Sequence, residues 1–246
     1  MKMRKLVLRI TLPLLLLAFG SVAHAQGERP EFKMSCQEVV KLGLDKFADV
    51  YEKRTQGFSN AGQKAAFTYY VNCKRPTNDA LAAKLLYARN GLGVYEAKRG
   101  QIEDVREELN KYGEALWTLR YAEEGGGTMW GVIAANAFAY REDFIETFIK
   151  TLAASERKSP RARQQVNQSL ARIQRWLNNP KRKPFAENSD PNDVISNKKL
   201  YEQTMKDARN TLAQLRNTLQ DLPDFAAQRL AAQMAEETKN ALADSP

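Results

Sequence analysis

Apolar residues recur at intervals of three and four along most of the chain. This interval is the period of one face of an α-helix, whereas a half-buried strand would alternate apolar and polar residues. Alternating segments are absent from the sequence. The pattern therefore predicts an all-α protein, built as an irregular helical bundle or as stacked helical hairpins.

The first predicted helix has a clear start. Ser35 and Glu38 have the S-x-x-E spacing of a capping box, in which each of the two side chains accepts a backbone N–H of the other residue. We expect this helix to end near Gly57. A second helix is predicted over about residues 60–74, and it should end before Pro76 because proline disrupts helix interiors.

Glycines and prolines divide the rest of the chain into further helices. The predicted helices cover about residues 79–99, 102–124, 129–152, 160–177 and 194–222, and Pro223 starts or kinks a last helix with Phe225, Leu230 and Met234. The helix over 129–152 is apolar almost all round, which is typical of a core helix. Between Tyr201 and Leu222, apolar residues keep a strict four-three spacing, which favours a C-terminal helix pair or coiled coil.

The N-terminal residues look like a secretory signal. Four basic residues precede an apolar run over 12–19, and Ala23-His24-Ala25 fits the small-x-small cleavage pattern. We therefore expect cleavage after Ala25, and a periplasmic or secreted protein without a membrane span. The predicted parts are the signal (1–25), a helical domain (26–178), a proline-rich basic linker (179–193) and a C-terminal helical hairpin (194–246).

Cys36 and Cys73 are the only cysteines of the chain. Export places them in an oxidising compartment, which favours a disulfide. If the first two helices form an antiparallel hairpin, the two cysteines lie at facing ends of that hairpin. We expect one structural disulfide between them.

The residue types restrict the possible chemistry. His24 is the only histidine, and it leaves with the signal peptide. The mature chain then has no imidazole for a catalytic triad, a zinc site or a near-neutral general base. We expect no metal and no cofactor, and the composition favours a non-catalytic protein over an enzyme.

Two short segments resemble known families. Leu92-Gly93, Gly100, Val105 and Leu109 loosely resemble part of one tetratricopeptide unit, which implies stacked helical hairpins. The run from Gly126 to Val132 resembles the G-G-x-T-x-aromatic-G-[IV] segment of a family of phage-type muramidases. That resemblance implies an all-helical fold with a glutamate as general acid, for which Glu124 and Glu114 are the candidates. The alternative interpretation of this run is a glycine hinge between two helices.

Basic residues gather in one segment. Between residues 157 and 183 there are nine basic residues and no acidic residue: Arg157, Lys158, Arg161, Arg163, Arg172, Arg175, Lys181, Arg182 and Lys183. Without the four basic residues of the signal, the chain has 34 basic and 29 acidic residues. Such a segment attracts polyanions, although it can also be an ordinary solvated face. Because no aromatic residues interleave with the charges, we do not expect nucleic acid as the partner.

The sequence favours one function over two others. The favoured function is an exported, non-catalytic, envelope-associated binding or scaffolding protein that contacts a protein or an anionic polymer or lipid surface through the basic segment. Self-association through the C-terminal helices is a further expectation. The alternatives are a peptidoglycan glycosidase that uses Glu124 or Glu114, and a secreted factor that acts on a host or competitor.

Overall fold

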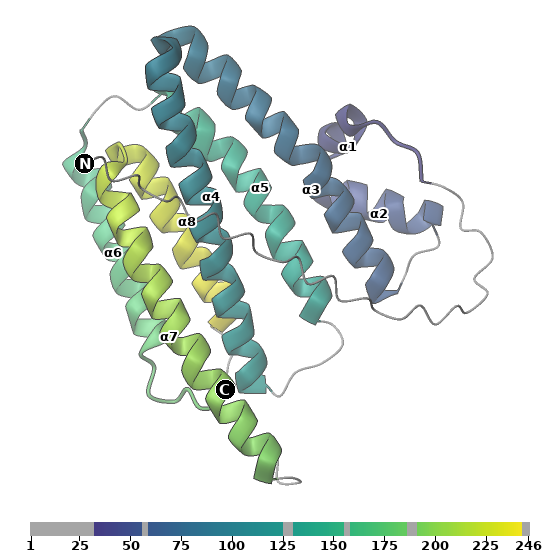
Figure 1. Cartoon of the computed structure of the whole chain (residues 1–246), viewed down its shortest axis with the longest axis vertical. Coiled ribbons are helices and arrows are strands. Elements are labelled where there is room, and N and C mark those ends of the chain that lie inside the picture. Colours follow the sequence, from purple (N-terminus) through teal and green to yellow (C-terminus); the bar gives the residue numbers. More distant parts are fainter. Residues whose placement is uncertain (1–31, 56–58, 125–129, 155–157, 186–190, 243–246) are drawn as a thin grey trace, which may run out of the picture. The chain divides into compact units, whose positions relative to one another are not determined.

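The computed structural model describes residues 32–55, 59–124, 130–154, 158–185 and 191–242. Within these residues the regular secondary structure consists of eight α-helices and one π-helical turn, with no strand (Figure 1). The prediction of an all-α fold is therefore confirmed. The predicted signal peptide, residues 1–25, lies outside the described residues.

The capping box at Ser35 is present. The Ser35 hydroxyl accepts the Glu38 N–H, and the Glu38 carboxylate accepts the Ser35 N–H at 3.0 Å. The helix does not run on to Gly57, however. It divides into α1 (Cys36–Leu42) and α2 (Leu44–Thr55), because Gly43 adopts a φ of 77° that glycine tolerates and other residues rarely do.

The predicted break at Pro76 is wrong. The helix α3 (Asn60–Ala82) runs through Pro76 and continues into a π-helical turn, η1 (Ala83–Tyr87). On the far side of the proline, Asn78 donates to the backbone oxygen of Glu142 at 2.8 Å and to its carboxylate at 3.1 Å. These buried bonds to a neighbouring helix help to hold the helix together across the residue that interrupts its own hydrogen bonds.

The next break is also displaced. Helix α4 (Ala88–Glu124) passes through Gly100, where we predicted an end, and is interrupted instead at Gly91, whose φ is 75° and ψ is 177°. Four helices follow, close to the predicted ranges: α5 (Trp130–Ala154), α6 (Pro160–Leu177), α7 (Pro191–Asp221) and α8 (Asp224–Leu242). No helix of the described part is long and apolar enough to cross a membrane.

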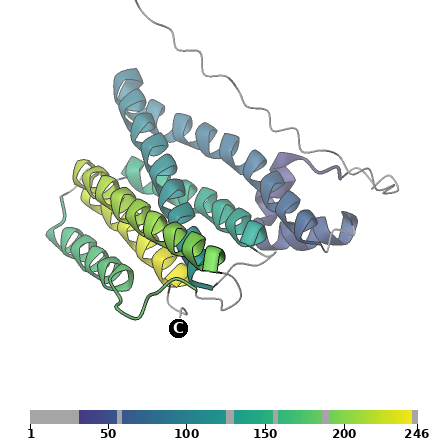
Figure 2. The ribbon, with the colours of Figure 1, turned by 60° about the horizontal axis from the view of Figure 1, so that its bottom comes forward.

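The helices of residues 32–246 belong to one compact unit. Helix α7 lies antiparallel to α4, since Thr218 bonds Glu108 near one end and Asn197 bonds the Ala122 carbonyl near the other. The buried stripe of α7 packs chiefly on α4, whereas α6 packs on α8 at the margin of the bundle (Figure 2). Helices from both sides of the predicted linker therefore share one core.

Two hydrophobic clusters fill the interior. The larger joins η1 and α3 to α8 and includes Phe148, Leu116 and Leu215, all inaccessible to solvent. The smaller gathers α1, α2 and the first half of α3 around Phe47 and Tyr70. Truncation of one such aromatic residue to alanine typically costs about 3 to 5 kcal/mol, so these clusters provide much of the stability.

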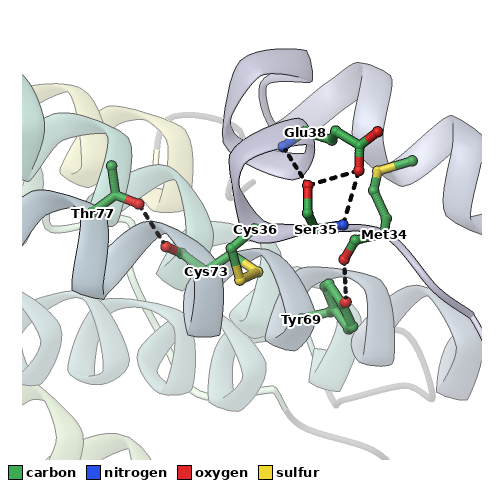
Figure 3. Close-up of a disulfide and its surroundings, with 7 residues drawn as sticks. All are labelled: Met34, Ser35, Cys36, Glu38, Tyr69, Cys73 and Thr77. Atoms are coloured by element: carbon green, nitrogen blue, oxygen red, sulfur yellow. Dashed lines mark hydrogen bonds between the residues drawn. A yellow bond between two sulfur atoms is a disulfide. The ribbon is translucent and has the colours of Figure 1, made fainter.

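The disulfide between Cys36 and Cys73 is present, as predicted. It joins the start of α1 to α3, with 4.8 Å between the two Cα atoms (Figure 3). Beside it, the Tyr69 hydroxyl donates to the Met34 carbonyl at 2.8 Å, which ties the segment before α1 to the same helix. The disulfide therefore fastens the smaller cluster where its helices meet.

A buried ion pair connects α5 to α8. The Arg141 Nε–H donates to both carboxylate oxygens of Glu237, at 3.0 and 3.1 Å. The pair lies against Gly113 of α4, where a Cβ atom would come within 1.7 Å of Arg141 Nη2. Burial raises the pKa of Glu237, and the positive charge of Arg141 opposes that shift.

The next two residues of α5 also form buried contacts with other helices. Glu142 pairs with Arg106 of α4 at 3.1 Å, and both side chains are almost fully buried. Asp143 accepts a hydrogen bond from the Tyr70 hydroxyl at 2.6 Å and pairs with Lys74 at 3.2 Å, both on α3. The charged triplet within the apolar helix α5 thus contacts α8, α4 and α3 in turn, and such paired contacts favour one register of packing.

Candidate functional site

Helix α6 carries most of the predicted basic segment. Ser159 caps its start by accepting the Ala162 N–H at 3.3 Å, and Pro160 occupies the first turn, as predicted. The buried side of the helix has a regular stripe: Ala162, Val166, Ser169, Ile173 and Leu177. Since one side is fixed against the bundle, most of the polar residues of α6 face outward.

The outward side of α6 is positively charged. Arg161, Arg172 and Arg175 are exposed, and α6 contains no aspartate or glutamate. Arg161 and Arg172 are eleven residues apart, about three helical turns, so they lie on the same side. Among the described residues, no acidic side chain lies within ion-pair distance of these three arginines.

Other helices neutralise exposed lysines with a neighbouring acid. Lys111 and Lys150 each pair with a glutamate one turn earlier on their own helix, and Lys198 and Lys239 also have a glutamate within 4.0 Å. Such pairs contribute little stability, but they balance the charge locally. The arginines of α6 lack this balance. Among the described residues, exposed lysines such as Lys46 and Lys53 of α2 also have no ion pair, but α2 contains acidic residues and α6 contains none.

Three lysines of the predicted set extend this face. Lys158 precedes α6, whereas Lys181 and Lys183 follow it, and all three are exposed. Arg157 lies outside the described residues. The exposed members of the predicted set are therefore Lys158, Arg161, Arg172, Arg175, Lys181 and Lys183, and we call them the α6 basic face.

Arg182 does not belong to this face, and the expectation that it is exposed on a linker is wrong. Its guanidinium donates to both carboxylate oxygens of Glu123, at 2.6 and 2.8 Å, and to the carbonyl oxygens of Trp176 and Leu242. Both side chains of the pair are 3% exposed. Arg182 is therefore a buried connection between the segment after α6 and helices α4 and α8.

Arg163 is also engaged within the fold. It pairs with Asp224 and donates to the carbonyl oxygens of Leu219 and Leu222, each at 2.6 Å. The pKa of Asp224 is lowered, first by a hydrogen bond from the Ser159 N–H and then by Arg163. Arg163 thus connects α6 to the end of α7 and the start of α8, and its charge is paired within the fold.

Two hollows lie between α6 and α7. The polar residues that line the larger, of about 660 Å³, are Lys158, Arg163, Asn167, Arg216, Gln220 and Asp224, and Asp224 pairs with Arg163. The Nε atom of Arg216 is buried there without a hydrogen-bond partner in the described residues. A guanidinium with an unpaired N–H favours a planar anionic group such as carboxylate or phosphate.

The second hollow, of about 440 Å³, lies further along the same helices, and its charged lining residues are Glu202, Lys206 and Arg209. The basic residues that α7 contributes were missed by the sequence analysis. Each directly follows a residue of the buried stripe, as Lys206 follows Met205 and Arg216 follows Leu215. Because consecutive residues of a helix are 100° apart, this spacing indicates a basic strip beside the core stripe.

The two candidate catalytic glutamates are not brought together as a general acid and its partner. Glu114 is exposed on α4 and lines a hollow of about 440 Å³, with Trp117 and Arg141. Glu124 pairs with Arg120 at 2.8 Å, one turn earlier. Residues 125–129, most of the muramidase-like run, lie outside the described residues.

Another hollow, of about 860 Å³, lies between α5 and α8. Its acidic lining residues include Asp143, Glu236 and Glu237, each of which has a basic partner: Lys74, Lys239 and Arg141. Within the part of the chain that the structure describes, no three His, Cys, Asp or Glu side chains are arranged to hold a metal ion. The acidic side chains of this hollow are therefore neutralised by basic partners.

Comparison with known proteins does not indicate a function. No protein-family model, no curated protein and no solved structure matches the chain. What the protein binds must therefore follow from its own side chains.

Proposed function

We propose that this chain is an exported, non-catalytic protein of the cell envelope that binds an anionic partner through the α6 basic face. The observation that carries the proposal is the set of exposed arginines Arg161, Arg172 and Arg175, which have no ion pair with any described residue, on a helix without acidic residues. Charges of one sign on one face raise the local concentration of oppositely charged ligands. Phosphate-bearing lipids and polymers of the envelope are ligands of this kind.

The hollows between α6 and α7 support the same function. Arg216 and Lys158 line the larger hollow, and Lys206 and Arg209 line the smaller. An extended polyanion can lie along the outward side of α6 while individual phosphate or carboxylate groups enter the hollows. Repeated weak contacts of this type give high avidity without a deep binding site.

Two observations support export. The basic and apolar leader ends in a small-x-small pattern at Ala25, and Cys36 and Cys73 form a disulfide. Disulfides are rare in the cytosol of mesophiles and common in exported proteins. Both observations favour the periplasm or the cell exterior as the place of action.

A charge-removal experiment tests the proposal. Arg161, Arg172 and Arg175 are replaced together by glutamine, and retention on a phosphocellulose resin is compared with that of the unchanged protein. A matched control replaces three exposed lysines on α2 and α3, Lys46→Gln, Lys53→Gln and Lys64→Gln, which removes the same net charge.

We expect the α6 variant to elute at a clearly lower salt concentration and the control variant to elute close to the unchanged protein. All six residues are exposed, so the melting temperature should hardly change in either variant. Equal losses in the two variants would show that net charge alone drives retention, and they would overturn the proposal.

The glycosidase alternative makes a different prediction. A glycosidase needs a general acid and usually a second carboxylate across the scissile bond, whereas Glu124 pairs with Arg120 on its own helix. We therefore expect no clearing of purified peptidoglycan. Clearing that disappears in Glu124→Gln or Glu114→Gln would support the glycosidase instead.

A further inference from the structure

The turn between α3 and α4 exposes apolar side chains instead of burying them. Leu92 is 61% exposed, Tyr87 is 55% exposed and Val94 is 43% exposed. We call residues 83–95 the α3–α4 tip. Single exposed apolar residues are common on protein surfaces, but three within eight residues of one turn form a local apolar patch.

The backbone of the tip is irregular in two places. The π-helical turn η1 forms its first five residues, and Gly91 interrupts α4 with a positive φ of 75°. A Cβ atom added at Gly91 or Gly93 would meet no atom of a non-neighbouring residue within 4 Å. The chain therefore faces open space at both glycines. The first almost fully buried residue of α4 beyond the tip is Ile102.

Basic residues flank this apolar patch. Lys84 and Arg99 are exposed, and Glu96 is the only acidic residue between positions 83 and 101. The start of the α6 basic face lies at the same end of the bundle. Gln101 bonds the Asp221 carbonyl at 3.5 Å, and Asp224, three residues later, accepts the Ser159 N–H.

We propose that the α3–α4 tip inserts into the surface of an anionic lipid bilayer, with Leu92, Val94 and Tyr87 entering the boundary between headgroups and acyl chains. This deepens the proposed function by naming a lipid surface as the anionic partner, and it rests on that function for the contribution of Lys158 and Arg161. In a bilayer, the apolar acyl chains lie directly beneath the layer of headgroup phosphates.

The composition of the tip matches those two layers. Leu92 and Val94 have no polar group, whereas a tyrosine has an apolar ring and a polar hydroxyl and is enriched at membrane interfaces. Lys84, Arg99, Lys158 and Arg161 are placed to contact phosphates around it. Insertion of so few apolar side chains gives reversible docking rather than permanent anchoring.

A fluorescent label at the tip tests insertion. Both native cysteines are in the disulfide, so Leu92→Cys supplies one reactive thiol for an environment-sensitive dye of the NBD type. The control places the dye at Gln214→Cys, an exposed residue in the C-terminal half of α7. On vesicles that contain phosphatidylglycerol, we expect a brighter, blue-shifted emission at position 92 and no change at position 214.

A second variant separates insertion from charge. Leu92→Ser with Val94→Ser should weaken vesicle binding by about a hundredfold, since burial of each of the two apolar side chains is worth about tenfold. Retention of the same variant on phosphocellulose should be unchanged, because its basic residues are intact. The α6 variant with three glutamines should lose retention on phosphocellulose.

The outcomes distinguish the two proposals. Vesicle binding without a dye response at position 92, or vesicle binding that the serine variant leaves unchanged, overturns tip insertion but leaves the α6 basic face in place. No binding to vesicles also overturns it, and if phosphocellulose retention persists, a non-lipid polyanion is the partner. Phosphocellulose retention that the α6 variant does not reduce overturns the proposed function itself.

Discussion

Arg182 and Glu123 form a buried ion pair in which one guanidinium nitrogen donates to both carboxylate oxygens, at 2.6 and 2.8 Å. The residues on either side, Lys181 and Lys183, are exposed. Three consecutive basic residues therefore have two different roles. Arg182 holds the segment after α6 to the bundle, whereas the charged groups of Lys181 and Lys183 are exposed to solvent.

We predict that Arg182→Gln lowers the free energy of unfolding by about 3 to 5 kcal/mol, because it leaves the buried carboxylate of Glu123 without its partner. Denaturant unfolding followed by circular dichroism measures the change. Lys181→Gln with Lys183→Gln is the control and should change stability by no more than about 0.5 kcal/mol. A loss for Arg182→Gln that is no larger than the control would contradict the buried role.

Reduction of the disulfide should destabilise the fold. The two cysteines are 37 positions apart, and closing a loop of that size is worth about 4 kcal/mol in the chain-entropy model. For a protein of this length, the melting temperature should fall by about 10 °C. Calorimetry with and without reductant tests this prediction, and two titratable thiols in the oxidised protein would refute it.

Gly113→Ala should be destabilising although alanine is the better helix former. The added methyl group would lie 1.7 Å from Arg141 Nη2 and 2.7 Å from Glu237 Oε2. Alanine gains about 1 kcal/mol in helix propensity, but disruption of a buried ion pair costs about 3 to 5 kcal/mol, so the loss should dominate. Gly100→Ala in the same helix has open space around it and should not destabilise the protein.

Asp224 should make the protein sensitive to acid. Its pKa is lowered in the folded state by the Ser159 N–H and by Arg163, so its contribution is present above its ordinary pKa of about 4 and is lost as the pH falls through the lower folded value. In Asp224→Asn the stability at neutral pH should be lower. Its deficit relative to the unchanged protein should shrink below pH 4, as thermal melts across this range would show; a deficit independent of pH would contradict the assignment.

Local signals in the sequence predicted several elements correctly. The capping box of Ser35 and Glu38, the cap at Ser159 and the stripe from Met205 to Leu222 depend on neighbouring residues or on helical periodicity alone. The disulfide needed one further step, which was the assumption of a hairpin. These features can be predicted because each depends on residues within a few helical turns or, for the disulfide, on the predicted export.

The errors arose where distant residues decide the outcome. Pro76 lies within a helix that Asn78 ties to α5, and Arg182 is buried because Glu123 lies 59 positions away in the sequence. Residue type alone does not show whether the helix is interrupted at Gly91 or at Gly100, since glycine permits a break at either position. The exposed members of the basic segment can be distinguished from the buried ones only when their partners on other helices are known.

The salt dependence of binding tests the α6 basic face most directly. Exposed charges are screened over roughly 10 Å at 0.1 M salt, so a partner held by Arg161, Arg172 and Arg175 should dissociate as salt rises. We expect the affinity of the unchanged protein for lipopolysaccharide to fall by about tenfold or more between about 50 and 300 mM salt. The variant with three glutamines should bind weakly at both concentrations. Equal affinities of the two proteins at both salt concentrations would contradict the account.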